Sequence, residues 1–277
     1  MVAARYRLGE AIGTGGSSVV YEALDEHTGR LVALKILEPA SGFAATERER
    51  IFREARLAGA IRHESIVEVF DAGPLDGGGA WLAMERLEGE TLRSRLAECF
   101  WYPLEEGFDI ARKLLCALEA AHAHGVVHRD VNPSNVILSD TASGTRLTLI
   151  DFGISRTLGD PRSRVTEENV VVGTLGYMAP ELLFGDEPTA RSDVYSAAAT
   201  IYEVLSGRPP HVIDEGDVRG VMRALATSPE PLDAIRPAVP TELAAGVMRA
   251  LSKRPDDRPA DCRAMLEACA LERIQAA

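Results

Sequence analysis

The sequence has few cysteines and no long hydrophobic run. Its four cysteines, at positions 99, 116, 262 and 269, form no C-x-x-C pair, which argues against a zinc site and favours reduced thiols. No apolar stretch approaches the roughly 18 residues that a membrane-spanning helix needs. The basic N-terminus is not followed by the apolar segment of a signal peptide. We therefore expect a cytoplasmic protein without a membrane span.

Positive charge is also scarce. The 277 residues carry 30 Lys and Arg against 42 Asp and Glu, a formal net charge of −12. General nucleic-acid binding needs a basic surface, so this function class is disfavoured. Hydrophobic residues make up 46% of the chain, which is enough for a core in one large or two modest domains.

The hydrophobic pattern divides the chain into a β-rich first part and a helical second part. Before residue 86 it predicts one helix, over 46–62, among five strands at 6–12, 19–23, 31–37, 66–70 and 80–85. After residue 91 it predicts helices at 105–124, 179–184, 192–206, 218–226, 242–251 and 260–270, with short β segments at 126–127, 136–138 and 147–150. The boundary between the two parts falls near 86–90, and we find no internal repeat.

The polar residues of the segments His128–Asn135 and Asp151–Gly153 carry the most chemical information. Asp130 could accept the proton of an attacking hydroxyl, whereas His128 fits a packed structural role better. Asn135, five residues after Asp130, and Asp151 offer the oxygen ligands that magnesium prefers. These are the groups that phosphoryl transfer from a nucleotide to a hydroxyl requires.

The order H-R-D-x-x-x-x-N followed by D-F-G resembles the catalytic and magnesium loops of the protein kinase family. The resemblance extends over nearly the whole chain and is nearest to bacterial serine/threonine kinases of the Hanks type. It implies an α+β, two-lobed fold in which residues 1–277 form one kinase domain, with an N-lobe of about 1–86 and a C-lobe of about 90–277. It also implies ATP and Mg²⁺, with Mn²⁺ as an alternative metal, held by Asn135 and Asp151.

The expected nucleotide site lies in the first part of the chain. Glycines followed by a strand predict a β-hairpin lid over phosphates rather than a dinucleotide fold, although a plain hairpin turn would show the same pattern. By resemblance, Lys35 would position the α- and β-phosphates and Glu54 would pair with Lys35. The other expected nucleotide-binding residues are Ile12, Gly13, Thr14, Gly15, Gly16, Ser17, Ser18, Val20, Ala33, Met84, Glu85, Leu87 and Leu138.

The segment from Gly173 to Glu181 resembles the substrate-binding loop of serine/threonine kinases, with Thr174 near the catalytic Asp. Arg258 matches the arginine that pairs with Glu181, and Asp193 matches the aspartate that braces the catalytic loop. These matches argue against a small-molecule phosphotransferase and imply protein substrates with Ser or Thr hydroxyls.

Autophosphorylation is expected in the activation segment. Thr166 is the preferred site and Ser163 the second, with Arg129 as the group that would pair with the phosphate, and a transient homodimer would allow the reaction in trans. Solvated loop hydroxyls without such a role remain the alternative.

Asn132 departs from the family pattern, which has Lys at this position. An amide lacks the charge that would steady the transferred phosphoryl group, and loss of one electrostatic donor costs on the order of ten- to a thousandfold in rate. An active kinase that also phosphorylates its own activation loop is the main hypothesis. The alternative is a pseudokinase that binds nucleotide and signals as a scaffold.

Overall fold

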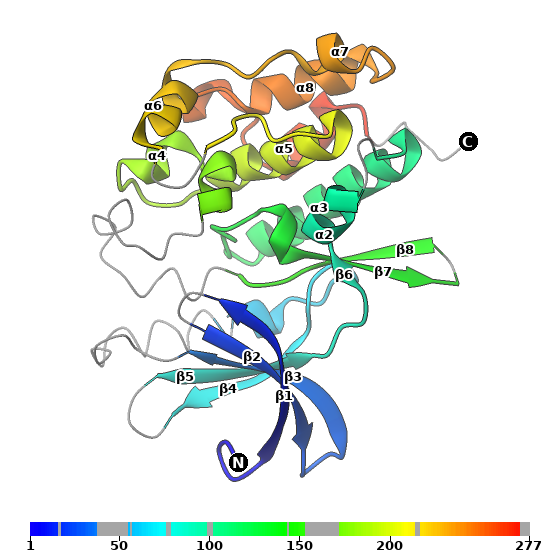
Figure 1. Ribbon diagram of the computed structural model, residues 1–277, viewed down its shortest axis with the longest axis vertical. Helices are drawn as coiled ribbons and strands as arrows, with labels where there is room; N and C mark the ends of the chain where they lie inside the picture. Colours follow the sequence, from blue (N-terminus) through cyan, green and yellow to red (C-terminus); the bar gives the residue numbers. More distant parts are fainter. Residues whose placement is uncertain are drawn as a thin grey trace.

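The computed structural model has a small β-rich lobe and a larger helical lobe, joined near residues 86–89 (Figure 1). It describes residues 1–15, 18–37, 55, 57–75, 79–98, 102–142, 144–152, 172–213 and 217–271. This architecture confirms the predicted α+β, two-lobed fold. Within those ranges, none of the helices is both long and apolar enough to cross a membrane.

The small lobe is a five-stranded antiparallel sheet in the order β1-β2-β3-β5-β4. Its strands are β1 (Tyr6–Gly15), β2 (Ser18–Asp25), β3 (Arg30–Leu37), β4 (Val69–Pro74) and β5 (Ala80–Glu85). Side chains on β3 alternate between two clusters, as a strand's period of two requires. Val32, Leu34 and Ile36 pack on one face, whereas Ala33 and Leu37 pack on the other. Lys35 shares the face of Ala33 and Leu37, so its ammonium is directed toward the large lobe.

A close backbone contact fixes the crossing between the lobes. Gly89 has φ +127°, and a Cβ built there would lie 2.2 Å from the carbonyl oxygen of Leu138. Only glycine fits this approach. It brings β6 (Glu90–Thr91) alongside β7 (Val136–Thr141), which pairs with β8 (Gly144–Leu149) in a second antiparallel sheet.

The large lobe is built from helices around a buried central one. Its longer elements are α2 (Leu92–Glu98), α3 (Leu104–Ala123), α5 (Ala190–Ser206), α6 (Val218–Ala226), α8 (Thr241–Ala250) and α9 (Cys262–Ala268). Its shorter elements are η1 (Pro133–Asn135), η3 (Val172–Tyr177), α4 (Pro180–Leu183), α7 (Leu232–Ile235) and η4 (Pro255–Asp257).

Helix α5 forms the centre of this lobe, and every residue from Ser192 to Ser206 is buried. A capping box between Thr189 and Ser192 begins the helix, and Gly207, in the left-handed region with φ +76°, ends it. The hydroxyls of Ser196 and Thr200 donate to carbonyls one turn earlier, so these buried polar groups are satisfied inside the helix. The capped and buried first turn of α5 therefore holds Asp193 in a fixed position.

Two sequence predictions of local structure need correction. Residues 126–127 form no strand, because Val126 instead donates its N–H to Ala121 at the end of α3. The strand expected at 66–70 starts later, at Val69, and Ile66 makes only an isolated bridge to Leu149. Of the helix expected at 46–62, residues 46–54 and 56 lie outside the described part, residues 55 and 57–60 are helical, and residues 61 and 62 are not.

Candidate active site

Asp193 stabilises the backbone of the loop that carries Asp130. The Oδ2 of Asp193 accepts the backbone N–H of His128 at 2.7 Å, and its Oδ1 accepts that of Arg129 at 2.9 Å. Arg129 has φ +71°, a strained value for a residue with a side chain. Two bonds to one buried carboxylate stabilise this turn, which sets the direction of Asp130. Asp193 thus has the bracing position expected from the sequence.

His128 is a structural histidine, as the sequence analysis predicted. It is fully buried, and burial lowers the pKa of its imidazole, so the ring is neutral. Its Nε2 donates to the carbonyl of Ile150 at 2.9 Å, and its ring packs 4.8 Å from that of Phe152. These contacts fasten the loop of Asp130 to the segment that carries Asp151.

A backbone hydrogen bond joins the segment of Asn135 to the segment that carries Asp151. The N–H of Ile150 donates to the carbonyl of Asn135 at 2.9 Å. The Nδ2 of Asn135 donates to the carbonyl of Asp130 at 2.8 Å, which turns its Oδ1 to the opposite side. Asp151 has φ +59°, which directs its carboxylate back toward the cleft.

This pair suits magnesium. Within the described residues no group of three or more His, Cys, Asp or Glu could hold a metal ion without further ligands. Mg²⁺, however, usually binds through one or two carboxylates and completes its shell with water and substrate phosphates. One carboxylate and one amide oxygen at the side of a cleft are the donor set that such a site needs.

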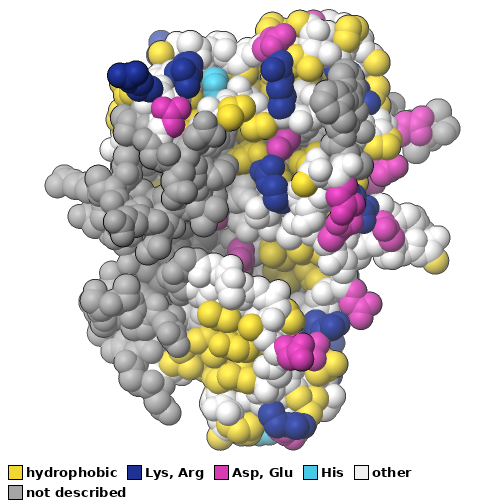
Figure 2. All heavy atoms as spheres, viewed as in Figure 1, with side chains coloured by type: hydrophobic (Ala, Val, Ile, Leu, Met, Phe, Trp, Pro, Cys, Tyr) yellow, Lys and Arg dark blue, Asp and Glu magenta, His cyan; other side chains and the backbone are white. Residues whose placement is uncertain are grey.

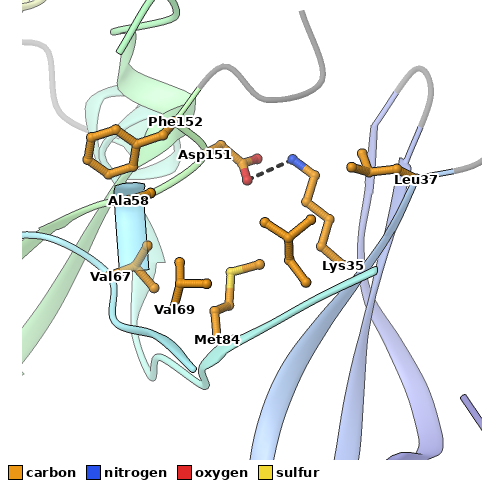
Figure 3. Close-up of a pocket in the computed structure, with 9 residues that line it drawn as sticks. Lys35, Leu37, Ala58, Val67, Val69, Met84, Asp151 and Phe152 are labelled. Atoms are coloured by element: carbon orange, nitrogen blue, oxygen red, sulfur yellow. Dashed lines mark hydrogen bonds and ion pairs between the residues drawn. The ribbon is translucent and has the colours of Figure 1, made fainter. Parts of the chain in front are cut away.

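Lys35 reaches across the cleft to Asp151. Its Nζ lies 2.7 Å from Asp151 Oδ1, and its side chain is only 8% exposed (Figure 3). The two side chains border a cavity of about 20 Å³, room for little more than one water molecule, behind Met84. Glu54, the expected partner of Lys35, lies outside the described residues.

Figure 2 shows a hollow between the two lobes, where hydrophobic side chains are visible. Val20, Ala33, Met84 and Leu87 pack in one cluster, and strand pairing places Ala33 opposite Met84. The glycine-rich segment is a hairpin: Gly13, Thr14 and Gly15 end β1, and Ser18 begins β2 opposite Gly15. Ile12 is 51% exposed on β1. Gly16 and Ser17 lie outside the described residues.

Leu138, which the sequence analysis expected at the nucleotide site, lies on strand β7. Its side chain is fully buried and packs with that of Val136 in the core of the large lobe. Because side chains alternate along β7, the half-buried Ile137 is directed to the opposite face, toward the small lobe. With Val136 and Leu138 both buried, the alternation along β7 favours Ile137 over Leu138 as the residue beside a nucleotide.

At the junction of the lobes, both the backbone N–H and the carboxylate of Glu85 form hydrogen bonds within the protein. Its N–H donates to the carbonyl of Glu68 at 2.8 Å, so any ligand bond from its backbone would use the carbonyl. Its carboxylate accepts two bonds from Arg146 on β8, at 2.9 and 3.2 Å. No local sequence signal links Arg146 to this junction, since the two residues are 61 positions apart.

The pairing predicted between Arg258 and Glu181 is confirmed. The fully buried guanidinium donates to both carboxylate oxygens at 2.7 Å, and also to the carbonyls of Arg191, Ser252 and Lys253. This contact fixes the start of α4, at the end of the expected substrate loop. The side chain of Thr174, and all of Gly153, Ser163 and Thr166, lie outside the described residues.

The sequence analysis missed a second buried anchor of that loop. Tyr177 donates its hydroxyl to Glu203 on α5, and Arg93 donates both to Glu203, at 2.7 Å, and to the Tyr177 oxygen. Burial raises the pKa of Tyr177, which therefore stays protonated as a donor. These three residues are far apart in the chain, and no motif joins them.

Comparison with known proteins agrees with this geometry. The family model described as "Protein kinase domain" matches residues 6–269. The chain is 37% identical to serine/threonine-protein kinase PknD of Mycobacterium tuberculosis over 91% of this chain and 37% of that protein. It is 36% identical to serine/threonine-protein kinase PknB of Mycobacterium leprae over 92% of this chain and 40% of that protein. The chain thus spans about 40% of the length of the curated relatives that it matches.

Solved structures give the same assignment. The crystal structure of the Mycobacterium tuberculosis PknI kinase domain superposes with a TM-score of 0.75 at 31% identity, over 98% of this chain and 96% of that one. With the family match over most of its length, the chain belongs to the protein kinase family, as a bacterial serine/threonine kinase catalytic domain of the Hanks type.

Proposed function

We propose that this domain transfers the γ-phosphoryl group of ATP to Ser or Thr hydroxyls of proteins, in the cytoplasm and with magnesium. The observation that carries the proposal is the meeting of three groups in one cleft. Lys35 contacts Asp151 at 2.7 Å, and the backbone of the Asp151 segment is bonded to that of Asn135, whose side chain holds Asp130. These contacts support a site in which Lys35 supplies a cation, Asn135 and Asp151 hold the metal ion, and Asp130 acts as the base.

Each group has a distinct role in the proposed reaction. Asp130 orients the substrate hydroxyl and takes its proton as the oxygen forms a bond to the γ-phosphorus and the bond from that phosphorus to the ADP oxygen breaks. Lys35 positions the α- and β-phosphates. Asn135 and Asp151 would hold Mg²⁺, which neutralises charge on the phosphates. The hairpin from Gly13 to Ser18 would cover the phosphates and exclude water.

A labelling experiment tests the function. Purified protein is incubated with γ-labelled ATP and Mg²⁺, alongside the isosteric Asp130→Asn variant, and label is counted on the protein and on a basic protein substrate. We expect label from the wild-type protein and a loss of about 10²- to 10⁴-fold in the variant. Nucleotide binding without Asp130-dependent label would support the scaffold alternative instead.

Autophosphorylation of the activation segment belongs to the same proposal. Thr166, or Ser163, would receive the phosphate in a transient homodimer, and Arg129 would pair with it. Mass spectrometry after incubation with ATP would detect this modification, and its absence from both residues would contradict the proposal.

A further inference from the structure

Asn132, the residue that departs from the family pattern, is bonded to the carboxylate of Asp130. Its side chain is buried, and its Nδ2 donates to Asp130 Oδ1 at 3.0 Å and to the Asp130 carbonyl at 3.1 Å. Its Oδ1 accepts the N–H of Ser134 at 2.9 Å. The amide therefore uses both its donor and its acceptor groups within the loop.

The bond to Oδ1 restricts the direction in which Asp130 can act. A carboxylate on a single side-chain bond would otherwise rotate, and each rotation would exchange the oxygen presented to a substrate. With Oδ1 held by Asn132 at 3.0 Å, this rotation of the carboxylate is restricted. The backbone is held as well, because the Asp130 carbonyl accepts from both Asn132 and Asn135.

The local chain conformation makes this contact rigid. Asn132 is the N-cap of η1, with φ −160° and ψ 165°, and Pro133 follows it with a fixed φ. The side chain of Asn132 thus makes two kinds of contact. Its oxygen caps η1 by accepting the Ser134 N–H, and we call its bond to the Asp130 carboxylate the clamp. Neither contact requires a charge. A lysine at this position could donate to a phosphate, whereas the Asn132 amide donates to Asp130.

We propose that Asn132 is a positioning residue whose amide holds the Asp130 carboxylate in the orientation that accepts the substrate proton. This inference rests on the proposed kinase function and deepens it. The contribution appears in the chemical step, since positioning of a catalytic group affects the transition state more than the binding of substrates. On this proposal Asn132 contributes to catalysis by orienting Asp130, although it lacks the charge of the lysine that the family has at this position.

Two variants separate the clamp from the cap. Asn132→Asp keeps the size and the acceptor for the Ser134 N–H but loses the donors to Asp130. Asn132→Ser is neutral and short: its hydroxyl can still cap Ser134, but it cannot reach Asp130 Oδ1. We expect kcat to fall about 10²-fold in both variants, with KM for ATP and the affinity for a fluorescent ADP analogue within about twofold of wild type.

The measurement is steady-state phosphorylation of a basic protein, with wild type and Asp130→Asn in parallel. Equal kcat in wild type and Asn132→Ser would overturn the positioning role, even if Asn132→Asp were impaired by its added charge. A rise in KM for ATP at unchanged kcat would also overturn it. If the wild-type protein itself gave no Asp130-dependent label, the proposed function would fail and this inference with it.

Discussion

Lys35 on β3 and Asp151, just after the end of β8, form an ion pair across the cleft, with 2.7 Å between Nζ and Oδ1. They are 116 positions apart in the chain. Lys35 is nearly buried, whereas the Asp151 side chain is 31% exposed, so the carboxylate keeps a side on which a metal ion can approach. The ion pair thus joins the residue proposed to bind the α- and β-phosphates, Lys35, to the residue proposed to bind the metal ion, Asp151.

Lys35→Met should abolish most activity while leaving the sheet intact, because methionine keeps the apolar stem but removes the charge. We expect kcat/KM to fall by about 10²- to 10³-fold, the usual effect of removing one electrostatic donor. Arg7→Met is the control, since Arg7 lies in the same sheet in an exposed pair with Glu26. Activity of Lys35→Met within tenfold of wild type would show that Lys35 is not part of the site.

Asp151→Asn tests the metal site. The variant keeps the shape of the side chain but loses the charge that attracts a divalent cation. Binding of a fluorescent ADP analogue should be tightened by Mg²⁺ in the wild-type protein and should be independent of Mg²⁺ in the variant. If Mg²⁺ tightened binding equally in both proteins, Asp151 would not be a metal ligand.

Asp193→Asn should weaken both folding and catalysis. An amide offers one acceptor oxygen, whereas the carboxylate accepts the N–H groups of His128 and Arg129 on different oxygens. One N–H would remain unsatisfied in a buried place, which costs about 1–3 kcal/mol. Urea unfolding should report this loss, and kcat should fall with it because the turn at Arg129 is no longer held. An unchanged free energy of unfolding would refute the bracing role.

Arg258→Ala should cost about 3–5 kcal/mol, since it leaves Glu181, whose side chain is only 10% exposed, without its cation. The exposed pair of Arg208 and Glu230 provides the matched control, with side chains that are 53% and 55% exposed. Arg208→Ala should change the free energy of unfolding by at most about 1 kcal/mol. Similar losses in both variants, measured by urea unfolding, would mean that burial does not distinguish the two pairs.

The sequence predicted most of the catalytic loop because its chemistry is local. Asp130, Asn135 and Asp151 stand at fixed spacing within or close to one loop, and the packed role expected for His128 agrees with its burial. Contacts between distant segments were predicted only where the family resemblance linked them, as for Arg258 and Glu181. Without such a link, the pairing of Glu85 with Arg146 was missed, because spacing carries no information over such separations.

Two residues show where local patterns were insufficient. Leu138 was assigned to the nucleotide site although strand alternation places it with Val136 in the core. Asn132 was interpreted from its lack of charge alone. Its bond to Asp130 depends on the extended backbone at Asn132 and the turn into η1, which only the three-dimensional structure reveals.

The pH dependence of stability should carry a contribution from His211. Its Nε2 accepts from Lys253 Nζ at 2.9 Å, and burial, helped by the charge of Lys253, lowers the pKa of His211 from 6.5 to about 4. Between these two values the unfolded chain binds a proton that the folded protein does not, so the free energy of unfolding falls as pH falls from about 6.5 to 4. Above 6.5 this contribution is fully present.

His211→Gln should flatten that part of the profile, because glutamine can still accept from Lys253 but does not titrate. Urea unfolding at pH 7 and pH 5 should give a smaller loss of stability in the variant than in the wild-type protein. His27→Gln, at an exposed histidine on the turn between β2 and β3, is the control and should leave the difference as it is. Equal losses in wild type and His211→Gln would mean that His211 takes up its proton at the same pH in the folded and unfolded chains.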